Sequence, residues 1–324
     1  MEIQVDVRKA VWSRYWSHGI AHSCGGSYGN RYEGSLARFW RTVAGALPAG
    51  AHVLDIATGN GAVPQLLLDG ADSPIACDAI DLAQPDPQWL AQLPEHKRRQ
   101  LRFHAQQVAE ALPFPDANFD LVTSQYGLEY TDLARSLPEI RRVLRPGGKV
   151  RLITHHADAR PVRLARTELR HLDWMMAPGG LLELGGAMIA PMARAATEAG
   201  RAALAGDAEA NALRARFNAL QGEATQLAAA SDCPDVLGDA RVDLGGILNL
   251  ALTHGAAVAH DAFGRMTRDL ADSRVRLQEL VDYALDETGV QGLASALARG
   301  GRQEVEAVVD DAVLMGWSIA ADPL

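Results

Sequence analysis

The sequence has few cysteines, no long apolar run and no excess of basic residues, and each shortage excludes a class of protein. Its three cysteines are widely spaced, which argues against a disulfide framework or a zinc site and favours a reducing cytoplasm. No stretch reaches the roughly 18 uninterrupted apolar residues of a membrane helix, and no apolar signal peptide opens the sequence. The net charge of −9 argues against nucleic acid as the main partner, because phosphates require a basic face. We therefore expect a cytoplasmic protein that binds neither nucleic acid nor a membrane.

What is present is an ordinary globular composition with a clear alternation of strands and helices. The chain has 324 residues, 48% of them hydrophobic, which is enough for a full α/β domain and about one further unit. Strands are predicted at 51–56, 75–80, 101–106, 119–124 and 149–154, and helices at 61–69, 86–93, 109–112 and 132–144. Such alternation predicts a doubly wound, mostly parallel sheet with helices on both faces.

The turn after the first predicted strand is a candidate ligand site. The strand ends at Asp55, and Gly59 and Gly61 follow before a helix begins. Glycines permit positive φ angles and let ligand atoms approach the backbone, and N–H groups at the start of a helix are free to donate. A tight strand-to-helix connection without a ligand is the alternative, and Ala57 breaks the G-x-G-x-x-G dinucleotide pattern.

The spacing to the next strand favours a nucleotide at this turn. The second predicted strand ends at Asp81, 20 residues beyond Gly61. In α/β nucleotide-binding units, this is the position of the carboxylate that accepts hydrogen bonds from a ribose. Asp78 competes for the same role, but it falls inside the strand rather than at its carboxyl end.

Aromatic residues are only 6% of the chain, yet seven stand within its first 40 residues: Trp12, Tyr15, Trp16, Tyr28, Tyr32, Phe39 and Trp40. A glycine-rich stretch, residues 18–30, separates two helix candidates in this segment. Residues 1–50 are predicted to form a helical cap, either a lid lined with aromatics or a helical hairpin packed on the sheet. The candidate lid contacts are Tyr15, Trp16, His22 and Tyr28.

Residues 157–315 have a composition rich in alanine, leucine and arginine with helical periodicity. Helices are predicted at 162–176, 187–204, 207–230, 247–272, 274–287 and 302–315, and a final strand within 316–324 returns to the sheet. We expect a helical insertion that recognises substrate, or alternatively one that forms a homodimer. Met176 is predicted to line the acceptor pocket, although apolar residues at helical spacing more commonly pack in a core.

Five short motifs stand in order between residues 51 and 156, a segment that makes up about a third of the chain. They are Asp55-Ile-Ala-Thr-Gly-Asn-Gly61, Ile80-Asp81, Ala109-Glu-Ala-Leu-Pro-Phe114, Phe119-Asp-Leu-Val122 and Arg142-Val-Leu-Arg-Pro-Gly-Gly148. In this order and spacing they resemble class I S-adenosylmethionine-dependent methyltransferases, specifically the branch of ubiquinone and menaquinone methyltransferases. The resemblance implies a Rossmann-like sheet that ends in an antiparallel pair, and S-adenosylmethionine as the cofactor.

The resemblance also implies roles for individual residues. The turn that ends at Gly61, including the Asn60 side chain, would hold the methionine portion of the cofactor, and Asp81 would accept both ribose hydroxyls. Val108 and Ala109 stand where members of the family contact adenine, usually through a polar side chain and a backbone N–H. Because Val108 has an apolar side chain, only the backbone contact of Ala109 is retained here. The complete predicted cofactor set is Asp55, Ala57, Gly59, Asn60, Gly61, Asp81, Leu82, Val108, Ala109 and Gln125.

Methyl transfer requires an acceptor held in line with the cofactor, and a hydroxyl or an acidic carbon also requires a base. His155 and His156 are the predicted bases, because the carboxyl ends of strands line the ligand crevice of open α/β sheets. The alternative, that each is a structural or solvated histidine, is the commoner case for any single histidine. Glu129, His18 and His22 are further candidate bases.

The end of the fourth predicted strand carries no carboxylate that would support a metal-dependent mechanism. Thr123, Ser124 and Gln125 stand there instead, so no metal is predicted. The resemblance implies that Gln125 lies beside the sulfonium, and Tyr126 is a predicted substrate contact.

These observations predict a methyltransferase that acts on a small-molecule acceptor, with O, N or C methylation left open. The alternatives are a peptide or protein methyltransferase that docks its substrate on the helical region, and a non-catalytic cofactor-binding module. Asn60 and Asp81 argue against the module, because modules that have lost catalysis commonly lose such residues.

Overall fold

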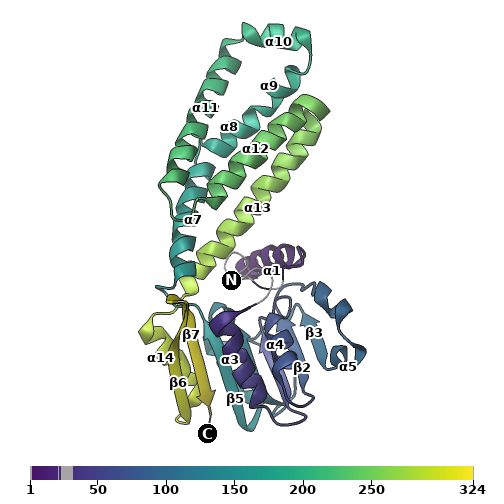
Figure 1. Cartoon of the computed structure of the whole chain (residues 1–324), viewed down its shortest axis with the longest axis vertical. Coiled ribbons are helices and arrows are strands. Elements are labelled where there is room, and N and C mark those ends of the chain that lie inside the picture. The colour runs from purple at the N-terminus through teal and green to yellow at the C-terminus, as the bar shows by residue number, and fades with distance from the viewer. Residues whose placement is uncertain (1, 21, 23–31, 324) are drawn as a thin grey trace. The chain divides into compact units, whose positions relative to one another are not determined.

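A computed structural model describes residues 2–20, 22 and 32–323 of the chain. It divides into two compact units (Figure 1). The sheet unit comprises Met1–Val162 and Glu279–Leu324, and the helical unit comprises Arg163–Gln278. Two helices, α7 (Arg160–Met176) and α13 (Ala256–Tyr283), span the boundaries between these units.

The sheet unit is built on a seven-stranded sheet in the order β3-β2-β1-β4-β5-β7-β6. The strands are β1 (His52–Ile56), β2 (Ala76–Asp81), β3 (Leu101–Ala105), β4 (Phe119–Gln125), β5 (Leu144–Thr154), β6 (Arg302–Asp310) and β7 (Val313–Asp322). Neighbouring strands from β3 to β5 pair in parallel, whereas β7 pairs antiparallel with both β5 and β6. The predicted doubly wound, mostly parallel sheet with an antiparallel end is confirmed.

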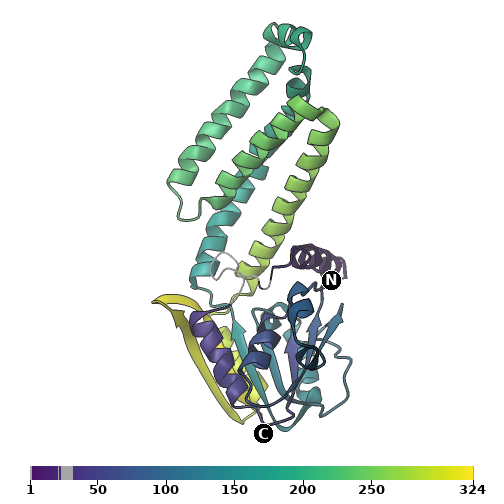
Figure 2. The same cartoon turned by 45° about the vertical axis from the view of Figure 1, so that its right-hand side comes forward.

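Helices cover both faces of this sheet because successive side chains of each strand point to opposite sides. Val53 packs with α3 (Gly34–Gly45) and α4 (Ala62–Gly70), which contact each other on one face (Figures 1 and 2). Leu54, the next residue, belongs to the core that contains side chains from α6 (Leu133–Val143) and α14 (Glu287–Ala298). The inner strands are therefore buried on both sides, as expected of a parallel sheet.

The register of the parallel strands gathers their carboxyl ends at one edge. Asp55 of β1 pairs with Ala79 of β2 and with Thr123 of β4, so the residues that follow these positions leave the sheet side by side. Short elements connect the strands here: η1 (Gln88–Gln92), α5 (Glu95–Arg98) and η2 (Leu128–Tyr130). The N-terminal helix α1 (Glu2–Trp16) also belongs to this unit.

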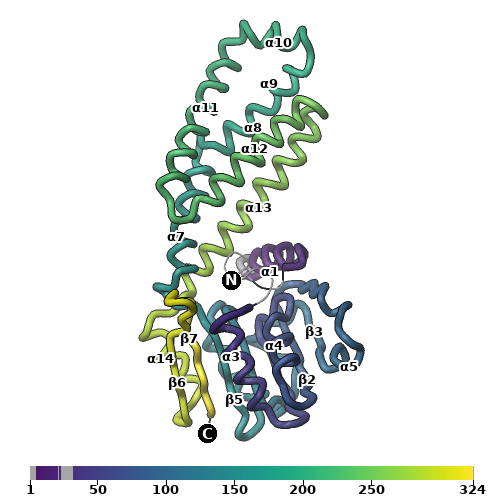
Figure 3. The backbone as a smooth tube through the Cα atoms, in the orientation of Figure 1, coloured from purple at the N-terminus to yellow at the C-terminus, as the bar shows by residue number. Residues whose placement is uncertain are grey.

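The helical unit has a core of its own, formed by apolar side chains of α7, α13 and all of the helices between them except α10 (Glu198–Ala205). The other helices between them are α8 (Leu181–Ala187), α9 (Ile189–Arg194), α11 (Ala208–Ala229) and α12 (Asp235–His254). The tube in Figure 3 follows the chain from β5 into these helices and back to α14. In the described parts of the chain, no helix combines the length and apolar character needed to cross a membrane.

Several predicted helices differ from those observed. The helix predicted at 302–315 is wrong, because these residues form β6, a turn and the start of β7. The helix predicted at 86–93 is reduced to the short 3₁₀ helix η1, and residues 109–112 form no helix. The predicted break near residue 273 lies instead at Gly255, whose φ of 89° ends α12.

Candidate active site

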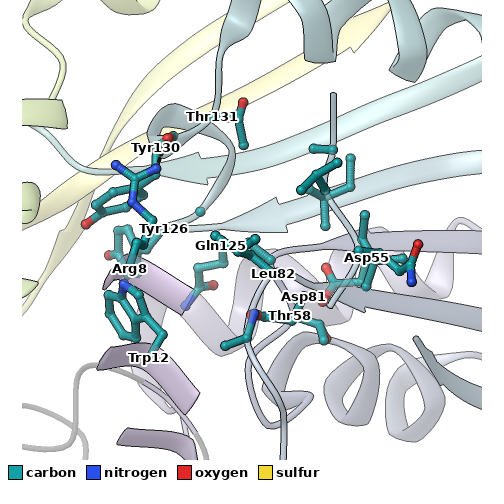
Figure 4. Close-up of a pocket in the computed structure, with 18 of the residues that line it drawn as sticks. Arg8, Trp12, Asp55, Thr58, Asp81, Leu82, Gln125, Tyr126, Tyr130 and Thr131 are labelled. Carbon is teal, nitrogen blue, oxygen red and sulfur yellow. Dashed lines mark hydrogen bonds between the residues drawn. The ribbon is translucent and has the colours of Figure 1, made fainter. Parts of the chain in front are cut away.

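A cavity of about 760 Å³ opens at the carboxyl ends of the strands in the sheet unit (Figure 4). Of the predicted cofactor residues, it is lined by Asp55, Ala57, Asp81, Leu82, Val108, Ala109 and Gln125. Of the predicted lid and substrate residues, it is lined by Trp16, His22 and Tyr126. The ends of β1, β2 and β4 and the segment after β3 therefore meet at one cavity, as expected for an open α/β sheet.

Asp55 places a buried carboxyl group against this cavity. Its Oδ1 accepts a hydrogen bond of 2.7 Å from the Thr123 hydroxyl, whereas its Oδ2 is buried and finds no hydrogen-bond partner among the described residues. Burial raises the pKa of Asp55 to about 7, because a carboxylate out of contact with water is disfavoured. A ligand that donates to Oδ2 would satisfy the buried atom that the protein leaves without a partner.

Asp81 organises the backbone around the same cavity. Its two oxygens each accept one backbone N–H, from Gly59 at 2.7 Å and from Ala83 at 2.8 Å. Burial raises the pKa of Asp81 as well, although these two hydrogen bonds oppose the effect. Each carboxylate oxygen has two lone pairs, so Asp81 retains acceptor capacity for ribose hydroxyls.

Gly59 and Gly61 both have the positive φ that glycine permits, 54° and 82°. A Cβ at Gly59 would lie 2.5 Å from the Trp16 ring, and a Cβ at Gly61 would lie 2.6 Å from the Phe103 ring. The absence of a side chain at both positions therefore also allows these aromatic rings to pack against the turn. Neither glycine is part of the cavity lining, and their contact with the cofactor stays a prediction.

The Asn60 side chain is not part of the cavity lining, and its predicted contact with the cofactor stays a prediction. Its Nδ2 donates to the carbonyls of Trp16 at 2.9 Å and Ile20 at 2.8 Å, and its Oδ1 accepts the Asp86 N–H at 2.7 Å. Asn60 therefore ties the end of α1 to the turn after β1 and to the segment after β2.

Gln125 and Tyr126 leave β4 at the centre of the cavity wall. The Gln125 Oε1 accepts a hydrogen bond from the Trp40 indole, and its Nε2 is buried without a partner among the described residues. Tyr126 and Ala57 both adopt a positive φ of 54°, an uncommon conformation for residues with a Cβ. Residues with such uncommon backbone angles cluster at active sites and ligand-binding sites, where the surrounding structure holds the backbone in place.

One end of the cavity contains residues that the sequence analysis did not select. Arg8 of α1 donates to Glu279 Oε1 at 2.6 Å, to the Tyr130 carbonyl at 2.7 Å and to the Tyr283 hydroxyl at 3.1 Å. The Trp12 indole donates to Glu279 Oε2 at 3.4 Å. Arg8, Trp12, Tyr130 and Tyr283 all line the cavity. The only signal for this group in the sequence was the aromatic enrichment around Trp12.

The structure does not bring the two predicted bases to the cavity. His155 is buried, with its Nδ1 at 2.8 Å from Glu129 Oε1 and its ring against Tyr126. His156 stacks on Trp317 at 4.2 Å between ring centroids, and burial lowers its pKa. Neither histidine is part of the lining, and His155 lies behind Tyr126 and Tyr130, whose rings contact it and which do line the cavity.

The other predicted positions have the following surroundings. Tyr15 packs against Trp12 and Trp16 but does not line the cavity, and Met176 packs against the core of the helical unit. Tyr28 lies outside the described residues. Among the residues that the structure describes, no group of three or more His, Cys, Asp or Glu is arranged to hold a metal ion.

Comparisons with known proteins agree with the geometry of the sheet unit. Residues 54–152 match the family model described as a methyltransferase domain. The chain is 33% identical over 133 residues to the Hahella chejuensis ubiquinone/menaquinone biosynthesis C-methyltransferase UbiE, covering 39% of this chain and 53% of that protein. It is 36% identical over 129 residues to the Deinococcus radiodurans demethylmenaquinone methyltransferase, covering 36% of this chain and 49% of that protein. The chain thus spans about half the length of these curated relatives.

Among solved structures, the YcgJ protein from Bacillus subtilis is 29% identical with a TM-score of 0.34, covering 43% of this chain and 58% of that chain. Because that score is low, we base the fold assignment on the strand order. Residues 54–152 thus match a methyltransferase domain, and the strand order and the cavity at the strand ends are similar to those of class I S-adenosylmethionine-dependent methyltransferases. Within that class, the domain resembles the branch of ubiquinone and menaquinone methyltransferases.

Proposed function

We propose that this protein transfers the methyl group of S-adenosylmethionine to a small aromatic molecule. The observation that carries the proposal is the convergence of Asp55, Asp81 and Gln125 on one cavity from the ends of three strands. Within the part of the chain that the structure describes, Asp55 Oδ2 and Gln125 Nε2 are buried without partners, so the cavity fits a ligand with both donor and acceptor groups. Bound S-adenosylmethionine supplies an activated methyl group, and the protein contributes binding, orientation and exclusion of water.

The residues suited to each part of the cofactor follow from their chemistry. Asp81 would accept the ribose hydroxyls, and Val108 with Ala109 would flank the adenine. Asp55 and the neighbouring Ala57 would border the methionine portion. The lining by these five residues supports this assignment.

The other half of the cavity favours an aromatic acceptor. Trp12, Tyr126, Tyr130 and Tyr283 line it together with the Arg8 guanidinium, and such rings provide flat contact surfaces with polar edges. The relative from Hahella chejuensis is a ubiquinone/menaquinone biosynthesis C-methyltransferase, and the one from Deinococcus radiodurans is a demethylmenaquinone methyltransferase. Together these points support a quinol-type ring as the acceptor, methylated at carbon. No observation on the described residues favours a protein substrate or a non-catalytic module.

A methyl-transfer assay tests this proposal. Purified protein is incubated under nitrogen with tritiated S-adenosylmethionine and 1,4-naphthohydroquinone, and the product is identified by mass spectrometry. We expect methylated product from the wild type and a large loss in Asp81→Asn. A protein that binds S-adenosylhomocysteine but methylates no quinol in such an assay would contradict the acceptor class. A protein that does not bind S-adenosylhomocysteine would contradict the enzyme class itself.

Two expectations from the sequence remain predictions. A cytoplasmic location follows only from the cysteine content, and a homodimer through residues 157–315 follows only from helical composition. Light scattering of the purified protein would decide the second.

A further inference from the structure

The Gln125 amide is held in one orientation by a partner outside the cavity. Trp40 is fully buried in α3, and its indole N–H donates to the Gln125 Oε1. An indole nitrogen donates and never accepts, so only the oxygen of the amide can face Trp40. The opposite orientation would set two donors against each other, and the Nε2 group must therefore be the end turned away from Trp40.

This Nε2 group is positioned to receive a ligand. Gln125 lines the cavity, is only 8% exposed, and its Nε2 has no hydrogen-bond partner among the described residues. A buried N–H₂ without an acceptor is unfavourable, so a bound molecule that accepts from it gains binding energy. Figure 4 shows Gln125 between two groups of side chains, with Asp55 and Asp81 on one side and Trp12 and Tyr130 on the other.

Resting on the proposed function, we propose that Trp40 is a positioning residue that fixes Gln125 as a donor to an oxygen of the methyl acceptor. The border between the two groups of side chains is where the acceptor would meet the cofactor. An N–H donor there matches a phenolate, hydroxyl or carbonyl oxygen, each of which has a lone pair to spare. An amine acceptor fits poorly, because its single lone pair must attack the methyl group and would be occupied by the Gln125 N–H.

The inference therefore specifies how a quinol-type acceptor is held, with Gln125 donating to one of its oxygens beside the carbon that is methylated. It also assigns a role to Trp40, which is not part of the cavity lining. The same donor chemistry would suit the carboxylate of the cofactor, so an experiment must separate these two oxygen sources.

Two probes of equal shape test the proposal by binding rather than turnover. Calorimetry measures the affinities of 1-naphthol and 1-naphthylamine for the protein saturated with S-adenosylhomocysteine. We expect the wild type to favour the naphthol by roughly three- to tenfold, the size of one net hydrogen bond. Gln125→Met should bring that preference close to one, because it keeps the length of the side chain but removes the N–H donor.

Variants of Trp40 show whether it acts through Gln125. Trp40→Phe keeps a ring but removes the N–H, so the naphthol preference should fall toward one. In a Gln125→Met background the same change should not alter the preference further, because the effect of Trp40 depends on the amide. Trp317→Phe is the matched control, since its indole donates to the Leu285 carbonyl at 3.0 Å outside the cavity, and it should keep the wild-type preference.

Each remaining outcome would overturn a specific statement. An unchanged preference in Gln125→Met, or no binding of either probe, would overturn the proposed donor role. A loss of S-adenosylhomocysteine affinity in Gln125→Met and Trp40→Phe, with the naphthol preference intact, would assign Nε2 to the cofactor carboxylate instead. Failure of the wild type to bind S-adenosylhomocysteine would refute the proposed function rather than this inference alone. If Trp40→Phe does not fold, Gln125→Met decides.

Discussion

At the scale of single residues, the carboxylate of Asp78 inside β2 is held by neighbouring protein side chains and is therefore not a second ligand for the ribose. Its oxygens lie 2.6 Å from His52 Nε2, 2.7 Å from His104 Nε2 and 2.8 Å from two nitrogens of Arg102. Burial by itself would raise the pKa of Asp78, but the hydrogen bonds from these three residues outweigh burial and lower it to about 2. Asp78 is therefore a structural anion, and it does not line the cavity.

Replacing Asp78 tests this assignment through stability. A carboxyl group with a lowered pKa stabilises the fold above its unfolded pKa of 3.8, and the contribution is lost as pH falls through about 2. We expect Asp78→Asn to cost about 2 kcal/mol near neutral pH, and the difference from wild type to shrink between pH 4 and pH 2. Urea denaturation at several pH values measures this. A constant difference across that range would refute the account.

Single residues also show where sequence reasoning was limited. His155 and His156 were selected for their place after β5, but a position in the chain does not give the direction of a side chain. The carboxyl of Glu129 holds one histidine and the ring of Trp317 holds the other. Tyr283 could not be predicted at all, because it follows a helical region of more than 100 residues that carries no motif.

At the scale of elements, hydrogen bonds attach the N-terminal helix α1 to the rest of the sheet unit at two places. Arg8 and Trp12 bind Glu279, and Asn60 binds the carbonyls of Trp16 and Ile20 at the end of the helix. Because α1 contributes Arg8, Trp12 and Trp16 to the cavity, these tethers set the position of one wall.

Asn60→Asp tests the second tether with little change in shape. The aspartate still accepts the hydrogen bond from the Asp86 N–H, but it cannot donate to the carbonyls of Trp16 and Ile20. We expect hydrogen exchange in the last turns of α1 to speed up at least about fivefold, while β1 and β2 remain protected. Asn211→Asp is the matched control, because it removes similar donors inside the helical unit and should leave α1 unchanged. Equal exchange in α1 of Asn60→Asp and wild type would show that Asn60 does not hold the helix.

The elements themselves differed in how well the sequence predicted them. Strands β1 to β5 were predicted because buried parallel strands are continuous apolar runs bounded by turns. Strand β6 was taken for a helix, because it lies at the sheet edge and most of its side chains are exposed. Buried and exposed side chains do not alternate along β6, so this segment lacks the period-two pattern that identifies a strand. Its pairing with β7 makes it a strand.

At the scale of the whole molecule, all described residues that line the cavity belong to the sheet unit. The motifs that carried the resemblance lie in this unit too, which is why the cofactor half of the site could be predicted in outline. The helical unit has a separate core and no matched motif. Its part in substrate recognition or assembly stays a prediction from composition.

Titration of S-adenosylhomocysteine into wild type, Asp81→Asn and Asp78→Asn by calorimetry tests the central claim most directly. We predict binding by the wild type and a loss of about 2 kcal/mol, roughly thirtyfold in affinity, in Asp81→Asn, which loses a charged acceptor of the ribose. Asp78→Asn should bind as the wild type does, because its carboxyl group faces cationic side chains instead of the cavity. Unchanged affinity in Asp81→Asn, or no binding by the wild type, would contradict the account.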